Sequence, residues 1–394
     1  MPALAPHVAR MPGSGVRRIL ELALQRPGTI ILAVGEPGEI AEPAVRGAAA
    51  AAWRAGEVRY TPNGGIRPLR EAIVAKLAAE NALHVDLEQV WVTVGATQAL
   101  HMAMALTLAR GDEVLVPDPG YTTFTMNAHL LQAVPVPYAL HAEHGFRPDI
   151  AELDGLVTER TRALIVNSPS NPLGATFDAA TMRALLELCA RHDLWLISDE
   201  VYERFAYGTP HVSPAALDGD GRVLSVFSLS KSHGLTGARV GWLVTPPGWR
   251  PTMLRVQESL VSCVDAPAQR AAVAALTEGQ SAVERAAEHY RRNLEAASAA
   301  LTARGLRHHV PSGAFYLWID VSHVSGDDVA AWCERFLDES GVAVAPGSAF
   351  GASGEGWIRV CAASDRADLL EGIGRLPAPA PTAAGRTEHT GAHP

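Results

Sequence analysis

Several short apolar runs in the middle of the chain end in side chains that can bind a ligand or react. The runs VTVG, PDPGY, IVNSPSNP, ISDEVY and SVFSLSKSHG, with the residues that directly follow them, supply Gly95, Ala96, Thr97, Tyr121, Asn171, Asp199, Tyr202, Ser228, Ser230 and Lys231. In open parallel sheets, ligands bind beyond the carboxyl ends of the strands. Because these residues follow predicted strands, we expect them to lie together in one site.

Lysine is rare in this chain, which draws attention to the two that are present. Of 33 lysines and arginines, only Lys76 and Lys231 are lysines. Lys76 lies in LREAIVAKLAAEN, where apolar residues recur at helical spacing, so we interpret it as part of a solvated helix face. Lys231 is flanked by apolar and small residues. A buried lysine, unlike an arginine, can lose its charge and act as a nucleophile or a base, so at this point Lys231 is either a reactive amine or a surface lysine in a loop.

Two further charged residues follow apolar strands. Asp199 follows LWLIS, which places a carboxylate at a buried strand end. An unpaired charge there costs several kcal/mol, so Asp199 requires a cationic partner. A helix N-cap or a structural salt bridge is the alternative. Arg359 ends the strand-like WIRV, where a single arginine is most often part of a surface salt bridge.

The elements that must position these residues alternate along the chain. Apolar strands are predicted at 89–95, 113–119, 134–138, 162–170, 194–200 and 223–230, and helical stretches such as 97–111 and 179–192 separate several of them. This alternation predicts a mostly parallel sheet covered on both faces. A strand at 239–246 follows closely enough to be antiparallel. Nearer the N-terminus, 9–26 contains a helix and 29–39 a strand ending in a Gly-rich turn.

The character of the sequence changes beyond about residue 270. A long Ala-rich helix at 270–305 is followed by AFYLWIDV, VAVAPGSAF and WIRVCAA, which together predict a smaller α+β domain. We expect an N-terminal arm at 1–40 that forms part of this small domain, a large domain at 41–275, the small domain at 276–376 and a disordered tail at 377–394, rich in Pro, Ala and Thr.

Composition limits the possible functions. The 394 residues favour two domains, and no run reaches the roughly 20 apolar residues of a membrane helix. With no secretory signal recognised, the cytoplasm is the expected location. A net charge of −9 without a basic cluster argues against nucleic-acid binding. Four widely spaced cysteines argue against a metal site or a disulfide framework, so small-molecule chemistry is favoured.

The whole pattern resembles the class I and II aminotransferases, a group of fold-type-I pyridoxal-phosphate enzymes. The matching stretches are RYTPNGGIRPLREAI, TVGATQAL, VPDPGYTTF, VNSPSNPLG, SDEVYERF, SLSKSHGLTGARVGW and WIRV, and the resemblance runs from about Gly35 to Arg359. It implies an α/β fold with a seven-stranded, mostly parallel sheet and a smaller domain. It also implies an enzyme that binds pyridoxal 5′-phosphate and moves an amino group from an amino acid to a 2-oxo acid by a ping-pong mechanism.

The resemblance assigns the reacting groups. Lys231 would form the Schiff base with the cofactor aldehyde and later move the proton of the substrate Cα. Asp199 would pair with the protonated pyridine nitrogen, so that the ring accepts electrons. Tyr202 and Asn171 would hydrogen-bond the phenolic oxygen of the cofactor, and Tyr121 would stack on its ring. These assignments give Lys231, Asp199 and Tyr202 the catalytic roles.

The resemblance also assigns the anion-binding groups. For the cofactor phosphate they are the amides of Ala96 and Thr97 at a helix N-terminus, the Ser228 hydroxyl and the Arg239 guanidinium, with Ser230 a weaker candidate. Tyr60 would reach the phosphate of the neighbouring subunit, which implies a homodimer. For the substrate, Arg359 would bind the α-carboxylate through two hydrogen bonds, with Asn171 and the backbone near Gly35 closing over the same group.

Departures from the family pattern bear on the substrate. Some aspartate-preferring members carry a lysine where this chain has Thr97, and 258–269 offers no cation from a partner subunit. A neutral aliphatic or aromatic amino donor is therefore expected. His233 and Ala238 receive no role. A β-lyase, a decarboxylase or an oxidase could use the same residues, and a non-catalytic regulator that binds the cofactor or an amino acid is an alternative of another class.

Overall fold

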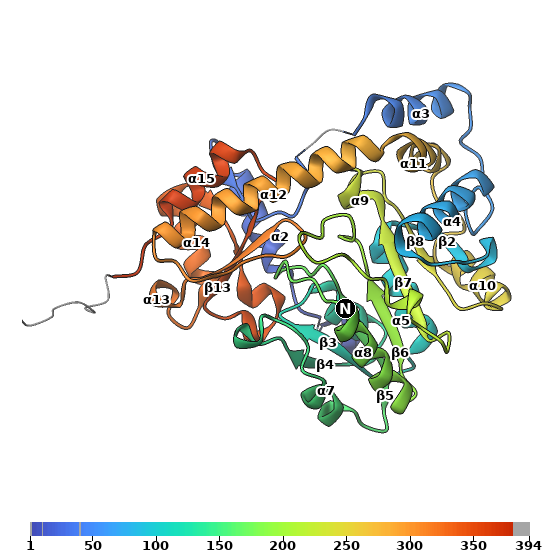
Figure 1. The fold of residues 1–394 in the computed structure, drawn as a ribbon, viewed down its shortest axis with the longest axis horizontal. Coiled ribbons are helices and arrows are strands. Elements are labelled where there is room, and N and C mark those ends of the chain that lie inside the picture. The colour runs from blue at the N-terminus through green and yellow to red at the C-terminus, as the bar shows by residue number, and fades with distance from the viewer. Residues whose placement is uncertain (1, 10, 39–40, 381–394) are drawn as a thin grey trace, which may run out of the picture.

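A seven-stranded sheet forms the centre of the computed structural model, which describes residues 2–9, 11–38 and 41–380 (Figure 1). Its strands, in spatial order, are β2 (Val90–Val94), β8 (Val240–Val244), β7 (Val223–Ser228), β6 (Trp195–Asp199), β5 (Thr161–Asn167), β3 (Glu113–Asp118) and β4 (Val134–Ala139). Only β8 is antiparallel to its neighbours, β2 and β7. The predicted α/β fold with a mostly parallel seven-stranded sheet is confirmed.

Helices cover both faces of this sheet, so most of its strands are buried on both sides. On one face, α5 (Gly95–Thr107), α6 (Thr123–Leu130) and α10 (Arg250–Leu260) pack against residues such as Trp91, Ile165 and Leu243. On the other face, α4 (Arg67–Asn81) and α11 (Ala266–Glu278) pack against β2 and β8, while α8 (Ala179–Arg191) lies against β5 and β6. Helices α3 (Pro43–Arg54), which contacts α11, and α7 (Ile150–Leu156), which contacts α8, complete this layer.

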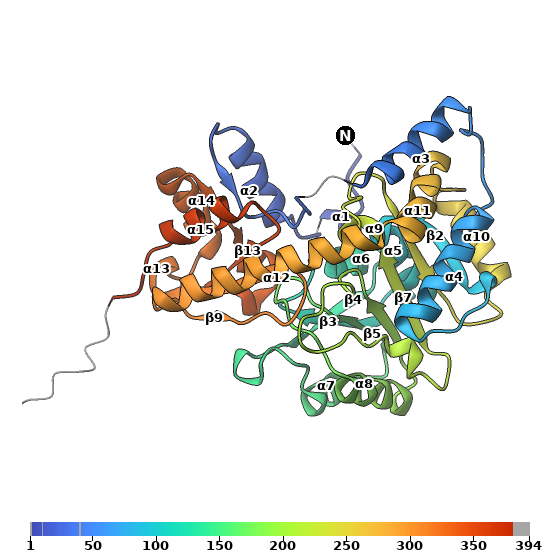
Figure 2. The same ribbon diagram turned by 45° about the horizontal axis from the view of Figure 1, so that its top comes forward.

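A second group of strands lies beside the large sheet (Figure 2). It contains the antiparallel sheet β12 (Ala345–Pro346), β13 (Trp357–Cys361), β10 (Tyr316–Asp320) and β9 (His308–His309), and the parallel pair β1 (Ile30–Ile31) and β11 (Val342–Ala343). Helices α2 (Gly15–Leu24), α13 (Ser322–Ser325), α14 (Val329–Ser340) and α15 (Arg366–Arg375) belong to the same region, and α1 (Pro6–Ala9) contacts α6. The β1–β11 pairing joins the N-terminal part of the chain to its C-terminal elements.

The predicted long helix is in fact two helices. Helix α11 ends at Glu278, and α12 (Gln280–Ala303) begins after Gly279 and runs to the smaller group of strands (Figure 1). A Cβ atom on Gly279 would lie 2.4 Å from the carbonyl oxygen of Ala275. A residue with a side chain would not fit here without a shift of the backbone, so the break falls at a position that requires glycine. The Ala-rich periodicity did not reveal the break. The predicted strand at 29–39 is likewise shorter, with only Ile30 and Ile31 paired.

The interpretation of Lys76 as solvated was wrong. Its side chain is 8% exposed and lies against the sheet.

Among the described residues no helix is long and apolar enough to span a bilayer. Most of the predicted tail, 381–394, lies outside the described residues.

Core packing in the smaller group of strands generates a stability prediction. Leu317 of β10 is completely buried, whereas Val310, in the same region, is 68% exposed. We expect Leu317→Ala to lower the free energy of unfolding by about 3 kcal/mol, because truncation leaves a cavity, and Val310→Ala to change it by less than about 0.5 kcal/mol. Thermal and urea unfolding of both variants check this. Equal midpoints for the two would contradict the packing described.

Candidate active site

A cleft opens at the carboxyl ends of β5, β6 and β7, between the large sheet and the smaller group of strands. Of the predicted site residues it is lined by Gly35, Ala96, Thr97, Tyr121, Asn171, Asp199, Tyr202, Ser228, Ser230, Lys231, Arg239 and Arg359. They come from the N-terminal arm, α5, α9 (Leu229–Ser232), β13, the ends of β6 and β7, and the loops after β3, β5 and β6 and before β8. The structure therefore brings together the predicted site residues except Gly95, which precedes Ala96 but does not line the cleft, and Tyr60, whose side chain is 92% exposed and does not line the cleft.

Lys231 lies on α9, the short helix that follows β7. Its Nζ donates a hydrogen bond to the Gly35 carbonyl oxygen at 2.6 Å, which links the N-terminal arm to the centre of the cleft. Burial lowers the pKa of this amine to about 8, and the positive charges of Arg359 and Arg239 act in the same direction. A substantial fraction of the amine is therefore neutral near physiological pH.

Asp199 ends strand β6 and is 3% exposed. Its side chain accepts one hydrogen bond, from the Val201 backbone N–H at 3.4 Å. Within the described part of the chain no cation lies within ion-pair distance of it. Burial raises the pKa of Asp199 to about 7. A carboxylate that is buried without a cation is suited to bind a cationic group of a ligand.

Donors for an anion converge at the beginning of α5. Gly95 has a φ of +70°, and a Cβ atom on it would lie 2.4 Å from Nη2 of Arg239. The guanidinium therefore rests against the helix N-terminus, with one nitrogen held by the Thr236 carbonyl oxygen at 2.8 Å. The Ser228 hydroxyl, which accepts a hydrogen bond from the Ser230 N–H, lines the same end of the cleft. Backbone amides, a helix dipole and a guanidinium at one place form an anion site.

Arg359 is held in place by buried acceptors. It is 3% exposed, and its two terminal nitrogens donate to Asn171 Oδ1 at 2.7 Å and to the Ala33 carbonyl oxygen at 2.6 Å. The guanidinium also lies over the rings of Tyr316 and Phe350, at 4.4 and 4.7 Å from their centroids. Its Nε has no hydrogen-bond partner within the described part of the chain. The planar group is therefore fixed in orientation and can still donate to a carboxylate.

Two residues of the cleft were missed at the sequence level. Tyr316, the first residue of β10, places its hydroxyl 2.7 Å from that of Tyr202, and a Cβ atom on Gly35 would lie 2.0 Å from the same hydroxyl. Asn167 donates to the Asp199 carbonyl oxygen and accepts from the Asn171 N–H. Asn167 directly precedes the SPSN turn, which was a usable signal. Tyr316 looked like an ordinary strand residue.

These features fit pyridoxal phosphate. The cofactor has a phosphate, an aldehyde and a ring nitrogen that takes up a proton, and the cleft offers an anion site, an amine with a lowered pKa and a buried carboxylate without a cation. Fold and site together define an α/β enzyme of the pyridoxal-phosphate type.

Comparisons with known proteins identify the family. The sequence profile described as "Aminotransferase class I and II" matches residues 28–376. The chain is 36% identical to an aspartate aminotransferase of Rhizobium meliloti, over 94% of this chain and 95% of that one, and 38% identical to an arginine–pyruvate transaminase of Pseudomonas aeruginosa, over 87% and 88%. A solved structure of Thermus thermophilus aspartate aminotransferase superposes with a TM-score of 0.90, at 35% identity over 95% and 99% of the chains. The chain belongs to the class I and II aminotransferases, which depend on pyridoxal phosphate.

The lowered pKa of Lys231 predicts how the apoenzyme takes up its cofactor. The neutral amine attacks the aldehyde, and it becomes the main form only above a pH of about 8. We expect the rate of pyridoxal phosphate uptake, followed by its near-visible absorbance, to rise with pH and level off above about 8. Lys231→Ala should show no such change of absorbance at any pH, because it lacks the amine that condenses with the aldehyde. A rate that continues to rise toward pH 10.5, the ordinary range of lysine, would contradict the predicted environment.

Proposed function

We propose that this aminotransferase moves an amino group from a neutral aliphatic or aromatic amino acid to a 2-oxo acid by a ping-pong mechanism, in a homodimer with shared active sites. The observation that carries the proposal is the buried Asp199, which has no cation within ion-pair distance among the described residues, in the same cleft as Lys231 and Arg359. Bound pyridoxal phosphate supplies an aldehyde that condenses with amines and a ring that accepts the electrons released when the substrate Cα loses a proton.

In this proposal Asp199 keeps a proton on the ring nitrogen, because a carboxylate buried without a cation favours a positive charge beside it. Lys231 would accept the proton of the substrate Cα once its amine is free. Asn171 and Tyr202 would donate hydrogen bonds to the phenolic oxygen of the cofactor. The contact of Tyr202 with the Tyr316 hydroxyl holds its ring in orientation.

Arg359 and Ala33 support a site for the substrate α-carboxylate. One terminal nitrogen of Arg359 donates to the Ala33 carbonyl oxygen, at the base of the arm that carries Gly35. A carboxylate that replaces this carbonyl would receive two parallel hydrogen bonds from the guanidinium. Because the amine of Lys231 also bonds to the arm, substrate binding and the position of the arm are linked.

The lining of the cleft supports a neutral substrate side chain. Val16 and Leu20 of α2, Met126 of α6 and Phe350 present apolar surface to it, and position 97 is a threonine. The exposed Arg17, also at the cleft, is the feature that would favour a second carboxylate instead. The relatives are named for aspartate, prephenate, aromatic amino acids and arginine, which makes the substrate a question for experiment.

Other fates of the substrate share the same residues. A β-lyase, a decarboxylase or an oxidase differs in which bond at Cα or Cβ is aligned with the cofactor ring, and a regulator would bind without turnover. The family and the named activities of the relatives favour transamination over these alternatives.

The half-reaction tests this proposal. When an amino donor is added alone, we expect the near-visible absorbance of the bound cofactor to be lost and one equivalent of 2-oxo acid to appear, with largest rates for neutral aliphatic or aromatic donors. A panel of donors, read by absorbance and by product analysis, measures this.

Products other than the 2-oxo acid separate the alternatives. Release of ammonia during turnover would indicate elimination, release of carbon dioxide would indicate decarboxylation, and release of peroxide would indicate oxidation. Any of these would contradict transamination. If aspartate or glutamate were the fastest donor and Arg17→Gln slowed only these two, the neutral-donor proposal would be wrong and Arg17 would bind the second carboxylate.

Exposed aromatic and apolar residues support the homodimer. Trp53, Val58 and Tyr60 lie close together along the chain, and their exposed fractions are 62%, 51% and 92%. Large apolar side chains clustered on a surface are typical of protein interfaces. Burial of this segment in a second subunit would bring Tyr60 to the phosphate site of the partner.

Subunit mixing tests the shared site. Tyr60→Ala and Lys231→Ala homodimers should both have low activity, because the first lacks a phosphate ligand and the second lacks the amine. When equal amounts are unfolded and refolded together, half of the dimers are mixed and hold one complete site, so activity should return to about a quarter of the wild-type value. If mixing restored no activity, Tyr60 would not act across the subunit interface.

A further inference from the structure

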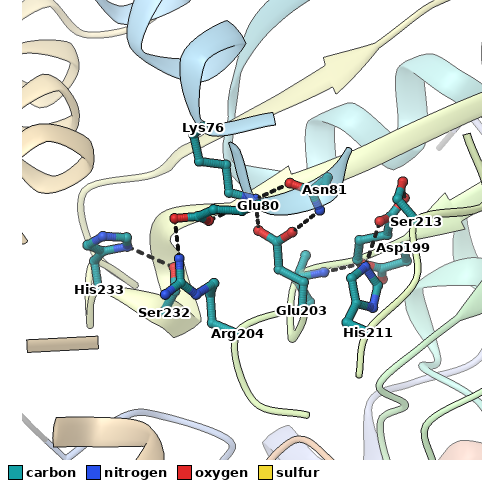
Figure 3. Close-up of polar contacts among 12 residues, drawn as sticks. Lys76, Glu80, Asn81, Asp199, Glu203, Arg204, His211, Ser213, Ser232 and His233 are labelled. Atoms are coloured by element: carbon teal, nitrogen blue, oxygen red, sulfur yellow. Dashed lines mark hydrogen bonds and ion pairs between the residues drawn. The ribbon is translucent and has the colours of Figure 1, made fainter. Parts of the chain in front are cut away.

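A buried group of charges lies on the face of the large sheet that α4 covers (Figure 3). Lys76 of α4 donates to Asn81 Oδ1 at 2.7 Å and forms an ion pair with Glu203, in the turn after β6. The second carboxylate oxygen of Glu203 accepts from Asn81 Nδ2 at 2.5 Å. Glu80, at 3.7 Å from Lys76 Nζ, forms a further ion pair with Arg204. Helix α4 and the turn are therefore joined by two ion pairs.

The Lys76–Glu203 pair is well shielded from water. The two side chains are 8% and 10% exposed. Burial alone would raise the pKa of Glu203, but the charge of Lys76, the His211 ring and the hydrogen bonds from Asn81 and Lys76 hold this pKa below its usual value. Removing one partner of such a pair leaves an uncompensated buried charge. The pair therefore fixes the turn after β6 against α4.

The turn fixed in this way carries two active-site residues. Asp199 and Tyr202 line the cleft, whereas Glu200, Glu203 and Arg204 do not. Glu200 is held by His211 at 2.9 Å and by the Ser213 hydroxyl at 3.1 Å. Because Glu203 is the residue after Tyr202, a change in its position is transmitted directly to the Tyr202 backbone.

Lys76 also contacts the strand that precedes Lys231. Its Nζ lies 4.9 Å from the centroid of the Phe227 ring, and the next residue, Ser228, lines the anion site. One amine thus contacts the strand end before the anion site as well as the turn after β6. The residues involved are not part of the cleft itself, since Lys76, Glu203 and Phe227 do not line it.

A metal site is the competing interpretation of this cluster. Ligand atoms of Glu200, Glu203 and His211 lie within 4.8 Å of one another. However, both oxygens of Glu203 already accept hydrogen bonds, one of them from the Lys76 ammonium. A cation bound there would lie close to that ammonium, which Coulomb repulsion opposes. The contacts favour an ion-pair network.

We propose that Lys76 and Glu203 are positioning residues, whose buried ion pair sets the place of Tyr202 and Asp199 relative to the cofactor. The inference rests on the proposed function, because it concerns how the cleft holds pyridoxal phosphate. Tyr202 is the group most affected, since its hydroxyl must reach the phenolic oxygen of the cofactor. If this donor is displaced, the deprotonated form of the bound chromophore is less stable and its pKa rises.

Three variants of the holoenzyme separate positioning from simple charge effects. Lys76→Met removes a positive charge and Glu203→Gln a negative one, so charge alone would raise the chromophore pKa in the first and lower it in the second. In the wild-type protein both carboxylate oxygens of Glu203 accept a hydrogen bond, one from Lys76 and one from Asn81. The Glu203→Gln side chain therefore directs its amide N–H at one of these two donors. Positioning predicts that this pKa, measured by absorbance titration, rises in both and in the double variant Lys76→Met/Glu203→Gln. We expect kcat to fall roughly tenfold, with KM for the amino donor nearly unchanged.

Two controls complete the experiment. Lys76→Arg keeps the charge and should largely restore the pKa and kcat. Arg67→Met, on the same helix, breaks an ion pair with Glu71 whose side chains are 78% and 50% exposed, and should change neither. Opposite shifts in the two single variants, or a lowered melting temperature with an unmoved pKa, would overturn the inference. If the wild-type protein showed no cofactor absorbance, the proposed function itself would fail instead.

Discussion

The burial of ionisable groups is the constraint on which the rest of this structure depends. Asp199 and Lys231 both lie where water is largely excluded, and burial moves their pKa values toward each other, up for the carboxyl group and down for the amine. Each group is thereby kept close to a change of protonation near neutral pH. The sheet provides this environment, because the strand ends of β6 and β7 are covered by helices and by the smaller group of strands.

Buried charges beside the cleft that take no part in the proposed chemistry are paired. The Lys76–Glu203 pair neutralises charge on the α4 side of the turn after β6, while Asp199 has no cation within ion-pair distance among the described residues. The charges on the two sides of this turn therefore differ in whether they are paired. One side is satisfied within the chain, and the other is left for a ligand.

Much of the site could be predicted from the sequence because several functional residues follow strands whose apolar pattern is clear. Asp199 after LWLIS and Lys231 after VLSVFSLS are examples, and the strands were found where they were expected. Lys76 shows the limit of such patterns. A helical repeat identifies the face that carries a residue, but it does not show that a lysine on its margin folds over a phenylalanine ring and meets a glutamate 127 positions away.

The sequence by itself determined the strands, the residues at their ends and the family, because these depend on local periodicity and on motifs that lie close together along the chain. Only the tertiary structure decided that Tyr316 meets Tyr202, that Gly279 divides a helix and that the arm with Gly35 reaches Lys231. The two contacts join segments that are distant along the chain, and the helix break redirects α12 toward the smaller group of strands. Their geometry is fixed by the packing of the large sheet against the smaller group of strands, which no local pattern records.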